Sequence, residues 1–283
     1  MTTEAARAAS GRVLERICAI IKEPSDRDIL AAFFAALFLQ VYLSRAFIGS
    51  ANGHLAAPLG AAELIGFAAI ASMLQRLNSD RILRSWDYVA IVFGGVAIVH
   101  PWSRVGAVVL TVLGLLFIFR SDRRRASIGQ LCLGLAWLGL WGPLVFRVIE
   151  PWFLPMETAL GYLPLSMFGS FSLVGNAILS DAGHGVVVNP ACSVFANTIR
   201  TTFIWLAMVK VQGTEFRSWH FRVLALSLVT VFLLNTSRLG LMAYSYNGYF
   251  FWHESYGASI MSWAMLATVI GLFCFGLRRE GSS

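Results

Sequence analysis

The stretch Asn189-Pro190-Ala191-Cys192-Ser193 separates a polar, glycine-rich segment from a long apolar one. Asparagine is a favoured helix N-cap, and proline suits the first helical position because an N–H there would have no partner. The spacing therefore predicts a helix with Cys192 in its first turn. Free N–H groups and the helix dipole stabilise an anion at that place, which favours the nucleophilic thiolate form of cysteine. The alternative is that Cys192 is a small packing residue in a membrane helix.

The composition is that of a membrane protein. Of the 283 residues, 57% are hydrophobic and 13% are charged, which is too apolar for a soluble domain. The net charge of +7 does not indicate nucleic acid binding, because the basic residues lie in short clusters between apolar runs. The four cysteines have no zinc-site spacing, and we expect no metal and no organic cofactor. The charged segment 1–28 lacks a cleavable signal, so the apolar run that follows is expected to be a retained anchor.

Eight apolar segments have about the 20 residues that cross a bilayer. They are Ile29 to Ile48, Ala57 to Leu74, Tyr88 to Val99, Val105 to Phe119, Ile128 to Ile149, Cys192 to Val211, Phe221 to Arg238 and Tyr256 to Leu277. The third and fourth are expected to form a hairpin around His100-Pro101-Trp102. With this map, most of the 22 Lys and Arg residues fall on one side of the membrane. The positive-inside rule makes that side cytoplasmic, with both termini there.

The segment from Glu150 to Asn189 is then the largest outer-face loop. Its run from Leu160 to Val174 is apolar but interrupted by Gly and Pro, and we expect it to be an interfacial or re-entrant helix. The short β-prone runs Gly175 to Ile178 and Gly185 to Val188 flank a turn, which predicts a small hairpin leading into Cys192.

These observations predict an all-α polytopic membrane protein with a small outer-face hairpin before the sixth helix. Residues 1–283 are expected to form a single integral membrane domain. Within it, residues 1–28 are the cytoplasmic N-terminal segment, residues 150–191 the outer-face loop, and residues 192–277 the helices that carry the chemistry.

Three reactive side chains are predicted to reach the outer face on the last three spans. Cys192 opens the sixth span, Asn235-Thr236-Ser237-Arg238 ends the seventh, and His253-Glu254-Ser255-Tyr256-Gly257 begins the eighth. Taken singly, the arginine fits an interfacial anchor and the histidine an ordinary interfacial residue. Their common depth favours a site. The remaining cysteines lie on the cytoplasmic side, so Cys192 is expected to have no disulfide partner.

Polar residues near these three are the candidates for binding a substrate. Arg200 falls about two turns inside the sixth span, where a charge is costly and usually faces the protein interior. We expect it to pair with Glu63 or Glu157, or to bind a substrate carboxylate. Asn197 and Asn235 complete the set of candidate substrate-binding residues. Further outer-face histidines are expected at His54, His100 and His184.

The motifs resemble the exosortase/archaeosortase family. The resemblance rests on Cys192-Ser193 after a Val-rich run, on Asn235-x-x-Arg238, and on His253 with an acidic neighbour and Gly257 four residues on. It covers the last third of the chain, and the eight-span count is also similar. The resemblance implies a multi-spanning cysteine enzyme whose triad would be Cys192, Arg238 and His253.

The chain also departs from the family's usual motif. Members usually continue Ala-Cys-Ser-Gly and soon reach an arginine, whereas here Val194 follows Ser193, and Asn197 stands near the position of that arginine. Asn189-Pro190 replaces the acidic residue often found before the alanine. The departures indicate a divergent subfamily with an altered substrate motif.

The resemblance implies a peptidase or transpeptidase at the outer face of the cytoplasmic (inner) membrane. Its partners would be the lipid bilayer and exported surface proteins that end in a short motif, a transmembrane helix and a basic tail, in the context of exopolysaccharide export. Two alternatives stay open. One is a non-catalytic transporter or assembly factor for envelope polysaccharide, which predicts polar side chains converging at the bilayer midplane. The other is a relative that binds sorting signals without cleaving them.

Overall fold

The chain was analysed as a computed structural model. The structure describes residues 25–51, 60–77, 83, 85–98, 103–119, 123–167, 169–181, 183–190, 192–213 and 216–280. These residues cluster into two compact units, Met1–Gly60 with Phe67–Ala136, and Ala61–Gly66 with Trp137–Ser283. The predictions made for residues 1–24, for His54 and for the hairpin His100-Pro101-Trp102 lie outside the described residues.

The described part of the chain is mostly helical, as the composition predicts. It contains four helices that are long and apolar enough to cross a membrane: Arg123–Ser166, Val194–Gln212, Ser218–Tyr244 and Tyr256–Gly276. Three shorter apolar helices are Ala61–Gln75, Ser85–Val96 and Arg104–Ile118. This content is consistent with a helical membrane protein.

The first unit is built from apolar helices. Its elements are α2 (Asp26–Ala51), most of α3 (Ala61–Gln75), α4 (Ser85–Ile98), α5 (Ser103–Ile118) and α6 (Arg123–Ala136). Helices α5 and α6 approach closely at Gly114 and Gly129. A Cβ added to Gly129 would lie 2.6 Å from the carbonyl oxygen of Gly114, so only glycine permits this contact. Close approach at small residues is a usual way for membrane helices to pack.

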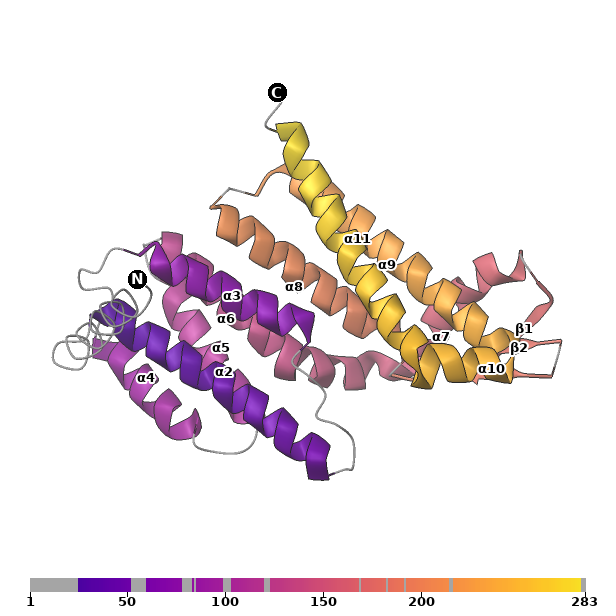
Figure 1. Cartoon of the computed structure of the whole chain (residues 1–283), viewed down its shortest axis with the longest axis horizontal. Helices are drawn as coiled ribbons and strands as arrows, with labels where there is room; N and C mark the ends of the chain where they lie inside the picture. The colour runs from indigo at the N-terminus through magenta and orange to yellow at the C-terminus, as the bar shows by residue number, and fades with distance from the viewer. Residues whose placement is uncertain are drawn as a thin grey trace, which may run out of the picture. The chain divides into compact units, whose positions relative to one another are not determined.

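The second unit carries the candidate site. Its helical elements are η1 (Trp137–Trp141), α7 (Gly142–Ser166), α8 (Val194–Gln212), α9 (Ser218–Tyr244), α10 (Tyr246–Tyr249), η2 (Phe250–Glu254) and α11 (Tyr256–Glu280), of which η1 and η2 are π-helical turns. Helices α8, α9 and α11 lie side by side (Figure 1). Helix α8 ends at Gly213, which adopts the left-handed conformation (φ 70°) that favours glycine at a C-cap.

Two elements differ from the sequence-based boundaries. The expected loop does not begin at Glu150, because residues 150–166 continue α7 as a helix through Pro151, Pro155 and Pro164. The helix expected from Leu160 to Val174 is present as far as Ser166, and residues 171–174 form a strand. Proline is tolerated in apolar helices where neighbouring groups satisfy the freed backbone. The apolar helical segment Arg123–Ser166 has 44 residues, more than the roughly 20 that cross a bilayer. Helix α9 likewise runs beyond Arg238, to Tyr244.

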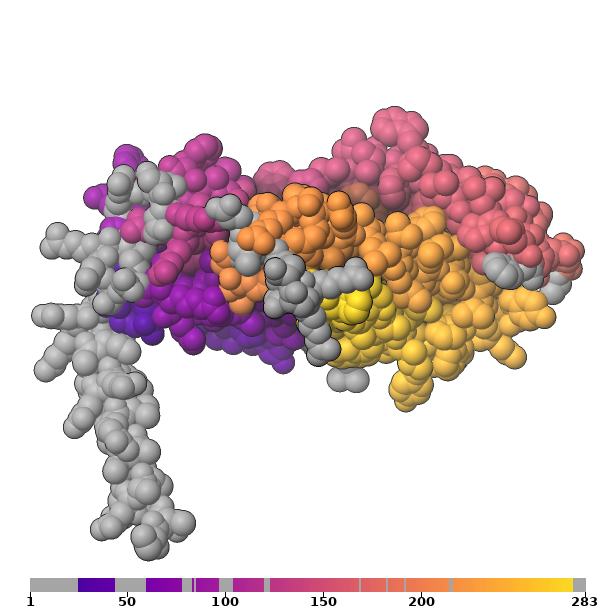
Figure 2. Space-filling view, turned by 90° about the horizontal axis from the view of Figure 1, so that it is seen from above, coloured from indigo at the N-terminus to yellow at the C-terminus, as the bar shows by residue number. Residues whose placement is uncertain are grey.

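A three-stranded antiparallel sheet precedes α8. Strand β2 (Ala177–Ser180) pairs with β3 (Gly185–Val187), as the predicted hairpin requires, and Val186 lies opposite Ile178. A third strand, β1 (Phe171–Val174), joins β2 through a tight turn at Gly175, where φ is 61°. The sheet and α10 lie at the same end of this unit (Figures 1 and 2).

Candidate active site

Cys192 lies in a turn between the sheet and α8, not in the first turn of a helix. Helix α8 begins at Val194, and Ser193 is its N-cap, with the Ser193 hydroxyl accepting from the backbone N–H of Phe195 at 3.1 Å. The sequence-based N-cap, Asn189, is therefore wrong, and the helix begins four residues later than predicted from it. Asn189 instead closes a turn, because its carbonyl oxygen accepts from the N–H groups of Cys192 (2.9 Å) and Ser193 (3.0 Å).

The Cys192 side chain is buried, with 2% of its surface exposed. It belongs to an apolar cluster formed by α7, the sheet and α9, in which Leu154, Ile178 and Met242 are fully or nearly buried. Tyr249 and Trp252, which precede the predicted His253 in the sequence, pack against the same cluster. The residues around the thiol therefore come from segments that are far apart in the sequence.

The Cys192 backbone is held from α9. The side-chain amide of Asn235 donates to the Cys192 carbonyl oxygen at 3.0 Å, and Asn235 is 2% exposed. The Asn235 side-chain oxygen is buried and has no hydrogen-bond partner in the described part of the chain. Asn235, which the sequence suggested as a substrate-binding residue, thus holds the backbone of Cys192.

The turn is also held from α7, by Glu157. This residue is 3% exposed, and its carboxylate accepts from the Ser193 hydroxyl at 2.5 Å and from the Val194 N–H at 2.6 Å. Glu157 therefore does not pair with Arg200, as one of the sequence-based expectations had it. A negative charge at a helix N-terminus interacts favourably with the helix dipole, which explains why α8 begins at Val194.

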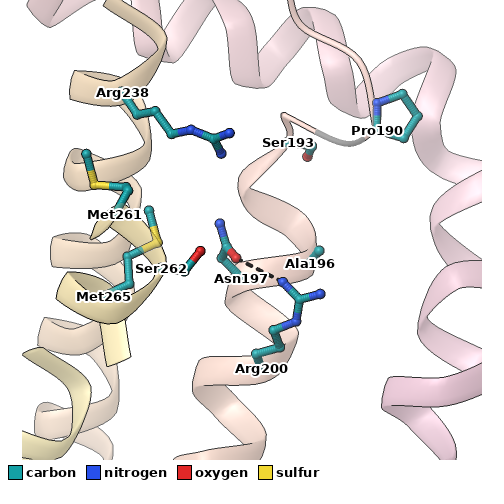
Figure 3. Close-up of a pocket in the computed structure, with 9 residues that line it drawn as sticks. All are labelled: Pro190, Ser193, Ala196, Asn197, Arg200, Arg238, Met261, Ser262 and Met265. Atoms are coloured by element: carbon teal, nitrogen blue, oxygen red, sulfur yellow. Dashed lines mark hydrogen bonds between the residues drawn. The ribbon is translucent and has the colours of Figure 1, made fainter. Parts of the chain in front are cut away.

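Arg238 reaches from α9 toward the start of α8 (Figure 3). Its Nε donates to the backbone carbonyl of Trp252 at 2.9 Å, which ties the guanidinium to the residue before His253. It lines a cavity of about 260 Å³. The other lining residues are Pro190, Ser193, Ala196, Asn197, Arg200, Met261, Ser262 and Met265.

Among the described residues that line this cavity there are two cations, Arg200 and Arg238, and no carboxylate. Arg200 is exposed, and its guanidinium donates to the side-chain oxygen of Asn197 at 3.3 Å, the bond drawn in Figure 3. Arg200 thus faces the cavity instead of pairing with Glu157. Of the three candidate substrate-binding residues, Asn197 and Arg200 line the cavity and Asn235 does not.

The groups around Cys192 act in opposite directions on the pKa of its thiol. Burial raises the pKa of the thiol, and the Glu157 charge raises it further, whereas the Arg238 guanidinium and a backbone hydrogen bond of Asn189 lower it. Burial dominates, so the pKa lies above its ordinary value. The prediction that this position by itself produces a thiolate is therefore wrong. A base is needed to remove the proton when the thiol reacts.

His253 lies on η2, at the same end of the unit. Its ring stacks on Tyr249, with centroids 4.9 Å apart, and Tyr249 in turn contacts the edge of His184 at 6.1 Å. The Nδ1 atom of His253 is buried without a hydrogen-bond partner among the described residues. Within the same residues, no hydrogen bond joins the Cys192 thiol to His253. The structure brings Cys192, Asn235 and Arg238 together and places His253 beside the residue that Arg238 contacts.

Two site residues were not among the sequence-based candidates for the site. Glu157 was considered only as a partner of Arg200, and Ser262 was not considered. Neither carries a local signal, because each reaches the site by tertiary packing. Among the described residues, no group of three His, Cys, Asp or Glu side chains could hold a metal ion. In comparisons with known proteins, no family model matches the chain, and no curated protein or solved structure is significantly similar to it.

Proposed function

We propose that this protein is an exosortase-like cysteine peptidase or transpeptidase embedded in the cytoplasmic membrane. It would process the C-terminal sorting signal of exported surface proteins at the outer face. The observation that supports this most directly is the arrangement around Cys192. Its carbonyl is held by Asn235, the Arg238 charge acts on its thiol, and Arg238 is bonded to the backbone next to His253.

The reaction would proceed through a thioester. His253 accepts the proton of the Cys192 thiol as the sulfur attacks a peptide carbonyl, and it then gives that proton to the leaving amine as the C–N bond breaks. The thioester passes to an amine in transpeptidation or to water in proteolysis, which restores the thiol. Arg238 stabilises the negative oxygen that develops during both steps, since a fixed cation is most effective where water is excluded.

Because the pKa of the Cys192 thiol is raised, this mechanism requires a base close to the thiol. A thiol that is stored protonated must lose its proton at the moment of attack, so a base must reach it once the substrate is bound. His253 has a buried, unpartnered ring nitrogen on the turn beside Arg238. The burial of Cys192 further implies that substrate binding displaces part of the apolar cluster around the thiol.

The membrane arrangement is part of the proposal. Eight spans with both termini in the cytoplasm would place the turn before α8 at the outer face. A substrate helix would lie beside α8, α9 and α11, with its basic tail on the cytoplasmic side. A carboxylate of the substrate would be bound by Arg200 and Asn197 in the cavity beside Cys192.

A second candidate function is a non-catalytic membrane protein, either a transporter or an assembly factor of envelope polysaccharide export. Two observations favour it: Cys192 is 2% exposed, and the cavity is lined by Ser193 instead of Cys192. A cavity with two arginines and no carboxylate among its lining residues suits the binding of an anion without cleavage.

The experiment that separates these functions is a comparison of Cys192→Ala with Cys274→Ala in the native host. Cys274 is an exposed cysteine on α11 and serves as the matched control. The C-termini of exported proteins with a motif, a membrane helix and a basic tail are measured by mass spectrometry. We expect unprocessed tails to accumulate in Cys192→Ala and not in Cys274→Ala. Equal processing in both variants, at wild-type level, would exclude the cysteine enzyme.

A further inference from the structure

Glu157 is a buried carboxylate that hydrogen-bonds to the two residues after Cys192, although it is not one of the three proposed catalytic residues. It sits on α7, is 3% exposed, and is not among the residues that line the cavity. Burying a carboxylate is costly unless its oxygens receive hydrogen bonds. Both oxygens do: Oε2 accepts from Ser193 and Oε1 from the Val194 N–H.

The two donors are the first groups of α8, immediately after Cys192. The Ser193 oxygen already accepts from the N–H of Phe195, which leaves its hydrogen free for Glu157. Glu157 thus links α7 to the N-cap, and the N-cap to the helix behind it. Without the carboxylate, the Val194 N–H would be a buried donor with no acceptor, which is strongly unfavourable.

The turn that carries the thiol is consequently fixed on two sides. Glu157 holds Ser193 and Val194 from α7, and Asn235 holds the Cys192 carbonyl from α9. Asn189 closes the turn from within the segment. Cys192 therefore has little freedom to move along the axis of α8 or to rotate its backbone.

We propose that Glu157 is a positioning residue for Cys192, which anchors the turn before α8 to α7 and places a negative charge beside that turn. The proposal rests on the proposed function only in taking Cys192 as the nucleophile. It assigns Glu157 no contact with the substrate. Because Glu157 acts through Ser193 and Val194, its effect is separable from that of Arg238, which faces the cavity.

The charges around the thiol give a signature that a purely structural role would not produce. Burial and the Glu157 charge raise the pKa of the Cys192 thiol, while Arg238 and a backbone hydrogen bond of Asn189 lower it. His253 and His184 approach the same region from η2 and from the turn before β3. Removing the charge of Glu157 should move the thiol pKa down, and removing that of Arg238 should move it up.

The test measures the rate of alkylation of Cys192 by iodoacetamide from pH 6 to 10 in the full-length, detergent-solubilised protein. Cys18, Cys132 and Cys274 are replaced by alanine in the background, so that one thiol reports. In Glu157→Gln we expect a midpoint at lower pH and alkylation at pH 7 at least about threefold faster. In Arg238→Gln we expect a midpoint at higher pH. Glu150→Gln, the same change on the same helix at a half-buried carboxylate, should leave the profile as it is.

Loosening of the turn must be separated from the charge effect. Ser193→Ala removes one of the two bonds and keeps the carboxylate, so it should raise the rate at every pH without moving the midpoint. If Glu157→Gln fails to fold, Glu157→Asp keeps the charge with a shorter reach, and should reproduce the rate increase of Ser193→Ala. The proposal would be overturned if the midpoint of Glu157→Gln equalled that of wild type, or if it shifted to higher pH as expected for Arg238→Gln. Because no substrate is used, the result is independent of whether the protein is a peptidase.

Discussion

Both compact units bury polar side chains, but at different places. In the first unit, apolar helices pack against one another through their described side chains. Helices α5 and α6 approach so closely at Gly114 and Gly129 that their backbones are in contact. Its buried acids are at the helix starts, where Asp26 accepts from the Leu83 N–H at 2.7 Å and from the Tyr88 hydroxyl. The second unit buries a carboxylate and an amide, Glu157 and Asn235, in its interior beside Cys192.

Under the proposed function, the second unit would carry the reaction and the first would contribute stability alone. Apolar packing depends on volume and tolerates many sequences, whereas a buried polar network requires specific partners and costs stability if one is lost. Retaining such a network around one cysteine is easiest to explain by chemistry at that cysteine. Substitutions in the first unit should then change stability alone, and those in the second should change reactivity in a folded protein.

The largest effect is expected from Gly129→Leu. The side chain cannot fit where a Cβ would already lie 2.6 Å from the Gly114 carbonyl oxygen, so α5 and α6 must separate. We expect a loss of about 3 kcal/mol of stability or no folded protein, measured by thermal unfolding and size-exclusion chromatography in detergent. Gly95→Leu is the control, since nothing lies within 4 Å of a Cβ there. If both variants were equally stable, the close approach of α5 and α6 would be unimportant.

Arg238→Gln should keep the fold and lose the reaction. Under the proposed mechanism, the change removes the cation that would stabilise the developing oxyanion, and such a loss typically lowers the rate by about 10²-fold. Processing of the sorting signal is the measurement, and Arg238→Lys should recover part of it by restoring the charge. Wild-type processing in the glutamine variant would contradict the assignment of Arg238 to the site.

Arg200→Gln should have a smaller effect that is confined to binding. Arg200 is exposed and makes one hydrogen bond, to Asn197, so stability should change by less than about 0.5 kcal/mol. The amount of substrate needed for half-maximal processing should rise, with the maximal rate unchanged. A lower maximal rate at saturating substrate would instead place Arg200 in the chemical step.

The smallest effect is on the pH dependence of stability. Because burial raises the pKa of Cys192 in the folded protein, the unfolded thiol ionises first, and between the two pKa values the folded state binds more protons. The stabilisation is complete below the unfolded value of about 8.5 and is lost as pH rises through the folded value. Unfolding of wild type and Cys192→Ala at pH 7 to 10 should show the difference between them changing in favour of the variant. A constant difference would mean that the thiol pKa is not raised.

Local sequence signals predicted much of the fold and part of the site. Apolar length placed α2, α4, α5, α8, α9 and α11 close to their observed positions, and turn residues predicted the pairing of β2 with β3. The sequence motifs singled out Cys192, Asn235 and Arg238, and in the structure Asn235 bonds the Cys192 carbonyl and the Arg238 charge acts on the thiol. Helix capping rules predicted Asn189 as the N-cap, which is wrong, because Ser193 caps α8 and Asn189 closes the preceding turn.

The features that local sequence signals did not predict depend on tertiary contacts. The acceptor that selects Ser193 is Glu157, which lies 36 residues earlier in the chain, and no local pattern marks it. The prolines at 151, 155 and 164 suggested a loop where the surrounding packing permits a helix. The raised pKa of Cys192 likewise comes from burial by segments on both sides of it, which outweighs the favourable position near a helix start.

The two anchors of the Cys192 turn cannot form at the same time during synthesis. The bond from the Val194 N–H to Glu157 joins residues 37 apart and needs only chain that already exists when α8 is made. The bond from Asn235 to the Cys192 carbonyl must wait for a further 43 residues, most of α9 among them. Until α9 is made, α7, the sheet and α8 can be present while the thiol lacks its cover from α9. Arg238, which lies on α9, can act on the thiol only after that.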